Sequence, residues 1–166
     1  MKVFKEEQRF TQSWLIILLV ISAIVPITII TKELIEKKIT TLEYLSIVAL
    51  IIFSICLIFI FKLRTRIDEI GIHYQFFPFN LKMKTIKWIE ISKIHIRKYD
   101  AISEYGGWGF KQGALWSKKN GNALNIKGDI GIQLELKNGK KLLLGTQKKT
   151  QAESVINNYK HQLTAS

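Results

Sequence analysis

The chain carries the apolar run WLIILLVISAIVPITIIT at residues 14–31 and a second run, YLSIVALIIFSICLIFIF, at residues 44–61. Neither run contains a Lys, Arg, Asp or Glu. Each is 18 residues long, and a helix of that length extends roughly 27 Å, close to the hydrocarbon thickness of a bilayer. We therefore expect a transmembrane hairpin over residues 14–61.

Residues 32–43 separate the two runs, and six of these twelve residues are charged, which predicts a short turn outside the lipid. A cleaved signal peptide is the alternative for the first run, because Lys2, Lys5 and Arg9 precede it. However, the run is long, contains Pro26 and is not followed by a small-x-small cleavage site. A second run so soon afterwards also favours the hairpin.

The orientation follows from the basic flanks. The segment before the first run and the turn each carry three Lys or Arg, whereas Lys62, Arg64 and Arg66 follow the second run closely. Because Lys and Arg collect on the cytoplasmic side, we expect both termini in the cytoplasm and the protein in the inner membrane. Residues 1–13 then form a cytoplasmic N-terminal segment, and residues 62–166 form a cytoplasmic domain.

The net charge of the chain is +12, and most of it lies in residues 62–166, which hold 19 Lys and Arg against 8 Asp and Glu. A basic domain held at a membrane is attracted to the anionic inner leaflet by about 1 kcal/mol per well-placed Lys or Arg. Solubility and orientation alone are the alternative explanation of this charge. The single cysteine, Cys56, lies in the second apolar run and predicts neither a disulfide nor a metal site.

Residues 62–166 show the two-residue period of β-strands. Residues 64–77 predict two strands around a turn near Glu69 and Gly71, ended by Pro78, and residues 85–99 alternate again. Asn138-Gly139 predicts a two-residue type I′ hairpin that pairs Lys137 with Lys140 and Leu134 with Leu143. Leu142 and Leu144 then point to the opposite face. Either that face is covered, or a bulge shifts the register.

A helix is expected at the C-terminal end, where Thr150 and Glu153 have the spacing of a capping box. Apolar residues follow at helical spacing: Ala152, Val155, Ile156, Tyr159 and Leu163. Strands and helices do not alternate, which argues against a parallel α/β fold. The predicted class is therefore α+β, with one helix packed on a small antiparallel sheet or barrel.

The segment EYGGWGFK at residues 104–111 is the most unusual stretch of the chain. Three glycines in four residues allow a sharp turn or a close approach of the backbone, and two large aromatic residues lie beside them. One interpretation is a bulged strand and turn under an aromatic lid, and the other is a loop that grips a ligand or a membrane surface. The candidate binding loop comprises Tyr105, Gly106, Gly107, Trp108, Gly109, Phe110, Trp116, Lys118 and Lys119.

Catalytic and metal chemistry find little support in the sequence. The three histidines form no metal-binding motif, and no serine lies in a nucleophile-elbow motif. Asp100 and Glu104 are spaced to act as a general acid and base, but acids in such loops more often pair with basic neighbours. We expect no catalytic residue, no cofactor and no metal.

Several motifs occur together along the chain: FKEEQRFTQSW at residues 4–14, RKY at 97–99, EYGGWG at 104–109, Gly128, Gly131, QL at 133–134, KNG at 137–139 and LGTQ at 144–147. This set resembles a group of uncharacterised bacterial two-helix membrane proteins with a pleckstrin-homology-like (PH-like) domain. The resemblance implies an antiparallel split β-barrel closed by a C-terminal helix. It implies no activity or catalytic residue, and a PH-like fold does not by itself establish phosphoinositide binding.

The function we expect is a non-enzymatic, membrane-anchored binding or scaffolding module for anionic lipid headgroups or an acidic protein partner. If the candidate loop faces the membrane, replacing Lys118 and Lys119 with Glu should weaken binding to anionic vesicles. An alternative is an accessory subunit of a larger membrane complex, with Ser22, Thr28, Ser46 and Ser54 at the helix interface. An enzyme of unknown class ranks third. Nucleic-acid binding would rest on charge alone.

Overall fold

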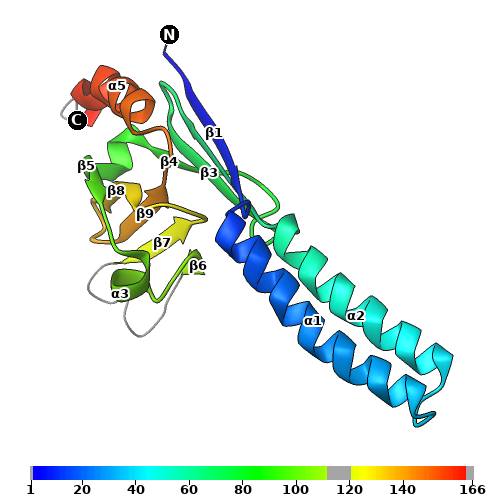
Figure 1. Cartoon of the computed structure of the whole chain (residues 1–166). Coiled ribbons are helices and arrows are strands. Elements are labelled where there is room, and N and C mark those ends of the chain that lie inside the picture. Colours follow the sequence, from blue (N-terminus) through cyan, green and yellow to red (C-terminus); the bar gives the residue numbers. More distant parts are fainter. Residues whose placement is uncertain (1, 112–120, 164–166) are drawn as a thin grey trace. The chain divides into compact units, whose positions relative to one another are not determined.

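The computed structural model describes residues 2–111 and 121–163, and its fold class is α+β (Figure 1). The chain divides into two compact units. Residues 10–61 form one, which we call the helix unit. Residues 1–9 and 62–166 form the other, which we call the sheet unit.

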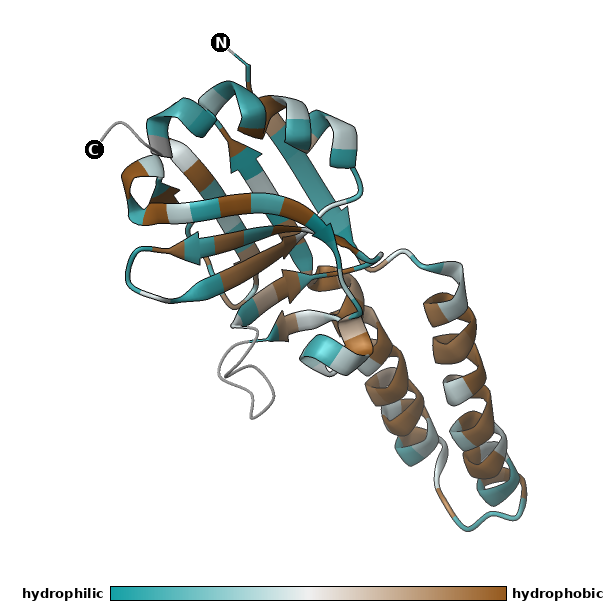
Figure 2. Ribbon diagram, turned by 90° about the vertical axis from the view of Figure 1, so that its left-hand side faces the viewer, coloured by the Kyte–Doolittle hydropathy of each residue, from teal (hydrophilic) through white to brown (hydrophobic). Residues whose placement is uncertain are grey.

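The helix unit contains α1 (Ser13–Ile35) and α2 (Thr41–Ile60), which confirms the two predicted apolar helices. Figure 2 shows apolar residues along almost the whole of both ribbons. Only 6% of the most apolar window of α1 and 0% of that of α2 is buried. Both helices are therefore long and apolar enough to cross a membrane, and they do not form the core of a globular fold.

Three of the four helix boundaries lie outside the limits of the apolar runs, whereas α2 ends at Ile60, one residue inside its run. Lys32 and Glu33 continue α1 to Ile35, because charged residues with long side chains are good helix formers. α2 begins earlier than predicted, where Thr40 and Glu43 form a capping box in which the Thr40 N–H donates to the Glu43 carboxylate at 2.7 Å. Apolarity marks the part of a helix that lipid can cover, whereas capping groups mark its ends.

The first sheet of the sheet unit, sheet A, is antiparallel in the order β1-β2-β3-β4. Its strands are β1 (Phe4–Arg9), β2 (Lys62–Ile67), β3 (Gly71–Phe77) and β4 (Lys84–Lys87). Strand β1 comes from the segment before α1, which the sequence analysis did not expect to be a strand. It pairs with β2 along its whole length, from Phe4 opposite Ile67 to Arg9 opposite Lys62.

The second sheet, sheet B, has the order β5-β8-β9-β7-β6. Its strands are β5 (Ile91–Lys98), β6 (Gly109–Lys111), β7 (Asn122–Asn125), β8 (Ile130–Leu136) and β9 (Lys141–Gly145). β7 occupies the edge of β9 that β8 leaves open, and the β7–β9 pair is parallel. The described strands thus form two sheets and no closed barrel, and the purely antiparallel arrangement of the split β-barrel that the resemblance implied is wrong at the parallel β7–β9 pair.

The single strand expected over residues 85–99 is wrong. A 3₁₀ turn, η1 (Trp88–Glu90), separates β4 in sheet A from β5 in sheet B. Trp88 is buried, and its indole N–H donates to the Asp68 carbonyl oxygen at 2.8 Å. The chain changes sheets at this anchored tryptophan, and the apparent alternation of apolar residues simply runs through the turn.

The predicted two-residue hairpin is also wrong, and the alternative of a shifted register is confirmed. Leu134 lies opposite Leu142, which leaves a loop of three residues. Of the loop residues only Gly139 has a positive φ, of 80°, whereas a type I′ turn would also require one at Asn138. The opposite face is covered as well, because Leu143 packs in a buried cluster with Tyr99, Ala101, Tyr105 and Ala123.

Replacing Gly139 with Val should lower the free energy of unfolding by about 1 kcal/mol or more, because a β-branched residue resists a positive φ. A Cβ at this position would meet nothing within 4 Å, so the cost arises from the backbone alone. Thermal unfolding of the full-length protein in detergent measures the effect, and Lys140→Val is the control. Equal melting temperatures for the two variants would contradict this description of the turn.

The predicted C-terminal helix is confirmed as α5 (Lys149–Tyr159), which packs against β1, β2 and β5 and is followed by the 3₁₀ turn η2 (Lys160–Leu163). Its buried stripe consists of Ala152, Val155, Ile156 and Tyr159. The predicted capping box at Thr150 is wrong, since the N-cap is Lys148 and makes no side-chain capping bond. Thr146 receives the Lys148 N–H instead, at 3.1 Å.

Strand β1 holds the two sheets together through buried polar groups. The Glu6 carboxylate accepts hydrogen bonds from the Thr146 hydroxyl at 2.6 Å and the Gln147 N–H at 2.8 Å. The Gln8 amide donates to the Gly145 carbonyl oxygen at 2.7 Å. All three hydrogen bonds join β1, the edge strand of sheet A, to the end of β9 and the two residues that follow it. Strand β1 is therefore an integral part of the sheet unit.

Candidate functional site

The glycine-tryptophan segment begins with a short helix, α3 (Ala101–Tyr105). The Asp100 carboxylate accepts hydrogen bonds from the N–H groups of Ile102 and Ser103 and so caps its N-terminus. The helix ends at Gly106, which has a φ of 69°. The Gly107 N–H then donates to the Ala101 carbonyl oxygen at 2.7 Å, as in a Schellman ending. Gly106 and Gly107 therefore terminate a helix, and Gly109 begins β6.

Glu104 is held by charged and polar neighbours. Its carboxylate receives two hydrogen bonds from the Arg97 guanidinium, at 2.6 and 3.1 Å, and one from the Asp100 N–H. The hydrogen bonds from Arg97 lower the pKa of Glu104. Arg97 also donates to the Tyr105 hydroxyl at 3.0 Å. Asp100 and Glu104 are thus engaged in capping and ion pairing, which are structural roles.

Trp108 lines a cavity of about 560 Å³ beside α3. The other lining residues include Tyr99, Asp100, Ile102 and Asp129. The Trp108 indole N–H donates to the Gly128 carbonyl oxygen at 3.3 Å, and burial raises the pKa of Tyr99 to about 12. The cavity therefore has an apolar wall and a neutral phenol, with acidic groups at its edge.

Phe110 lies in a second aromatic group. Its ring stacks on Phe79 with the centroids 4.9 Å apart, and it contacts the buried Phe76 at 5.8 Å. Phe79 belongs to the connection between β3 and β4. Phe110 thus joins the edge strand of sheet B to this connection of sheet A.

The register of sheet A places the ends of three strands side by side. Arg9 pairs with Lys62, and Lys62 pairs with Phe77, where β3 ends. The Lys62 ammonium lies over the Phe77 ring at 5.2 Å from its centroid. Residues 78–83 extend from this end of the sheet, and we call them the β3–β4 loop.

Positive charge predominates near this end of sheet A. Glu7 bridges Arg9 at 2.7 Å and Arg64 at 2.6 Å, and the hydrogen bonds from Arg64 and then Arg9 lower its pKa. In the described part of the chain, no acidic side chain pairs with Lys62, Lys82 or Lys84. These three ammonium groups are available to an anionic partner.

The β2–β3 turn lies at the opposite end of sheet A. Here the Asp68 carboxylate contacts His73 at 3.0 Å and Arg66 at 2.8 Å, while His73 contacts the Thr85 hydroxyl at 2.8 Å. Burial opposes ionisation of Asp68, but the hydrogen bonds from His73 and the Ile70 N–H hold its pKa below the ordinary value of 3.8. Each contact joins cross-strand or turn neighbours, so the cluster fixes the sheet.

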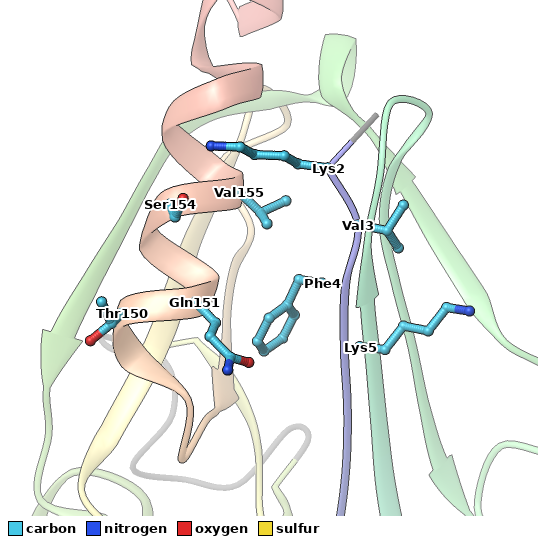
Figure 3. A pocket seen from close by; sticks show the side chains of 8 residues that line it. All are labelled: Lys2, Val3, Phe4, Lys5, Thr150, Gln151, Ser154 and Val155. Carbon is cyan, nitrogen blue, oxygen red and sulfur yellow. The ribbon is translucent and has the colours of Figure 1, made fainter.

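Figure 3 shows a wide groove of about 730 Å³ between β1 and α5. Phe4 points towards the helix and Val155 towards the strand, whereas Val3 and Lys5 point away from the groove. Phe4 and Val155 are buried and form its floor, and Thr150 and Ser154 lie along its rim. The groove therefore follows the line along which α5 packs against β1.

The hydroxyl groups considered for a helix interface are bonded within their own helices. Ser22 donates to the Leu19 carbonyl oxygen and Thr28 to that of Val25. The same holds for the two hydroxyls of α2: Ser46 donates to Leu42 and Ser54 to Leu50, both at 2.8 Å. These bonds satisfy the donors without any partner helix.

The structure divides the candidate binding loop. Tyr105 is fully buried, Gly106 and Gly107 end α3, and the Gly109 N–H donates to the Asn125 side chain. Only Trp108 and Phe110 present side-chain surface, and they do so at different places. Trp116, Lys118 and Lys119 lie outside the described residues.

Sequence analysis overlooked the β3–β4 loop. The segment FPFNLKMK, which contains the loop and one residue on each side of it (77–84), alternates apolar residues with basic ones after Asn80. This pattern was a usable signal of an amphipathic surface, but only the strand register shows where the loop lies. No protein-family model, curated protein or solved structure matches this chain.

Proposed function

We propose that this protein is a membrane-anchored binding module: a transmembrane helix hairpin holds a basic, PH-like domain against the cytoplasmic leaflet of the inner membrane. The observation that carries the proposal is the way the helices join the sheet unit. Only three residues separate β1 from α1, and one separates α2 from β2. Such short connections keep the domain at the lipid surface.

The pairing of β1 with β2 supports the orientation part of the proposal. The two strands hydrogen-bond along six residue pairs, so the chain must enter and leave the membrane on the same side. An even number of crossings satisfies this condition. The basic residues that follow α2 favour the cytoplasm as that side.

The ligand class follows from charge. Anionic phosphate groups of the inner leaflet attract exposed Lys and Arg held within a Debye length of about 8 Å at physiological ionic strength. The sheet unit is strongly basic. Lys62 lies at the end of sheet A to which the helices connect, Lys82 lies in the loop that extends from this end, and Lys84 begins β4 opposite Tyr74. Acidic lipid headgroups are therefore the proposed partner, with no cofactor and no catalytic step.

Cysteine labelling of intact cells tests the topology, in a background in which Cys56 is replaced by Ser. An impermeant maleimide should label Glu36→Cys, between the helices, and should label Ser166→Cys only after permeabilisation. Labelling of Ser166→Cys alone in intact cells would show the reverse orientation. Labelling of both sites, or of neither, in intact cells would show that the helices do not form a membrane-crossing hairpin.

A further inference from the structure

The β3–β4 loop exposes large apolar side chains next to basic ones. Phe79 is 60% exposed, Leu81 75% and Met83 43%. Lys82 and Lys84 are exposed beside them. Single exposed apolar residues are common on proteins, whereas here three lie within five residues.

Hydrogen bonds hold the loop in this conformation. The Asn80 N–H donates to the Phe76 carbonyl oxygen at 2.8 Å, and the Gln75 amide donates to the Leu81 carbonyl oxygen at 2.7 Å. Phe79 stacks on Phe110. The apolar side chains are therefore presented by an anchored loop.

Chain connectivity places the loop near the lipid surface if α2 crosses the membrane. Lys62 follows the end of α2 by two residues and pairs with Phe77. Two residues span at most about 7 Å, and paired Cα atoms lie about 5 Å apart. Phe77 thus lies within about 12 Å of the end of α2, and the loop begins at the next residue.

We propose that the β3–β4 loop is a second membrane contact, in which Phe79, Leu81 and Met83 enter the boundary between headgroups and acyl chains while Lys82 and Lys84 bind lipid phosphates. Apolar residues flanked by Lys are typical of segments that lie in this interface. The inference rests on the proposed function, because it takes the ends of the helices as the reference for the lipid surface.

The loop also defines how the sheet unit is held. The two covalent connections to the helices, at Arg9 and Lys62, lie on paired neighbouring strands. A lipid contact of the loop between β3 and β4 would add a third attachment point, on the other side of sheet A from β1. The sheet unit then keeps one face towards the membrane.

Fluorescence of single-cysteine variants tests the loop contact in the full-length protein, with Cys56 replaced by Ser. An environment-sensitive fluorophore is attached to Leu81→Cys, to Ile70→Cys at the opposite end of sheet A, and to Leu50→Cys in α2. The protein is reconstituted in equal parts of phosphatidylcholine and phosphatidylglycerol, with or without brominated lipid. Leu81→Cys should lose about half of its fluorescence to shallow bromines, as expected for a depth of about 5–10 Å, whereas Ile70→Cys should lose little.

The Leu50→Cys label separates the two proposals. If deep bromines do not quench it, the transmembrane hairpin itself is refuted. If they quench it while Leu81→Cys behaves like Ile70→Cys, the anchor stands and the loop contact is refuted.

Charge variants test the basic part of the contact. Lys82→Glu with Lys84→Glu should reduce quenching of the Leu81→Cys label, because carboxylates are repelled by phosphatidylglycerol. Lys137→Glu with Lys140→Glu, an equal charge change at the exposed β8–β9 turn, should leave it unchanged. Equal reductions in both variants would show that only the net charge matters and would overturn the assignment of Lys82 and Lys84.

Discussion

A chain that starts at residue 62 should not fold, although it contains every strand of the sheet unit except β1. The loss of β1 removes the buried side chains of Phe4, Glu6 and Gln8 and the six residue pairs that β1 forms with β2. Burial of Phe4 alone contributes about 2–3 kcal/mol, and the hydrogen bonds to Gly145, Thr146 and Gln147 are also lost. The total exceeds about 5 kcal/mol, which is the whole stability of many domains.

A matched variant restores the strand without the helices. Arg9 and Lys62 are the last pair of the β1–β2 ladder, so an Asn-Gly turn in place of residues 10–61 should close an ordinary hairpin. This variant should be soluble and unfold cooperatively, as followed by circular dichroism and amide NMR dispersion. Cooperative unfolding of residues 62–166 alone, at the same temperature, would show that β1 is dispensable.

Replacing Glu6 with Leu should cost about 2–4 kcal/mol of stability. The substitution removes the buried carboxylate that accepts hydrogen bonds from the Thr146 hydroxyl and the Gln147 N–H. A buried donor that loses its acceptor typically costs about 1–3 kcal/mol. Urea unfolding of the hairpin-closed variant measures the change. If that variant does not fold, urea unfolding of the full-length protein in detergent measures the change instead.

Glu7→Leu is the control, because it removes the same group from the adjacent residue of β1. Glu7 points to the outer face and pairs with Arg9 and Arg64, which remain accessible to water. Such exposed pairs contribute about 0–1 kcal/mol. If both substitutions shift the midpoint equally, the Glu6 hydrogen bonds do not join the two sheets as described.

The sequence predicted elements whose pattern is dominated by apolar residues. α1 and α2 belong to this group because they contain unbroken apolar runs, and α5 belongs to it because its buried residues recur at helical spacing. Strand β1 was overlooked because its inward positions carry Phe4, Glu6 and Gln8. Two of these are polar, and their partners lie about 140 residues further along the chain. Such a strand has no local signature.

Short-range geometry was less predictable than the elements themselves. α3 has only five residues, too few to show a helical period. The hairpin register depended on one backbone angle at Asn138, which the Asn-Gly motif does not determine. At the candidate site, sequence analysis found the aromatic residues Trp108 and Phe110 but not the β3–β4 loop, because Phe79, in a connection of sheet A, and Phe110, in sheet B, meet only in the folded chain.

The position of β1 also constrains how the protein is made. This strand leaves the ribosome before either helix, whereas Gly145, the partner of Gln8, is synthesised 137 residues later. Sheet A can form only after both helices have been synthesised, because β2 follows them in the chain. If the two helices cross a membrane as proposed, a chain in which only one of them crossed would hold β1 and β2 on opposite sides and leave the edge of β2 unpaired. On that topology, the pairing of β1 with β2 requires that both helices have crossed.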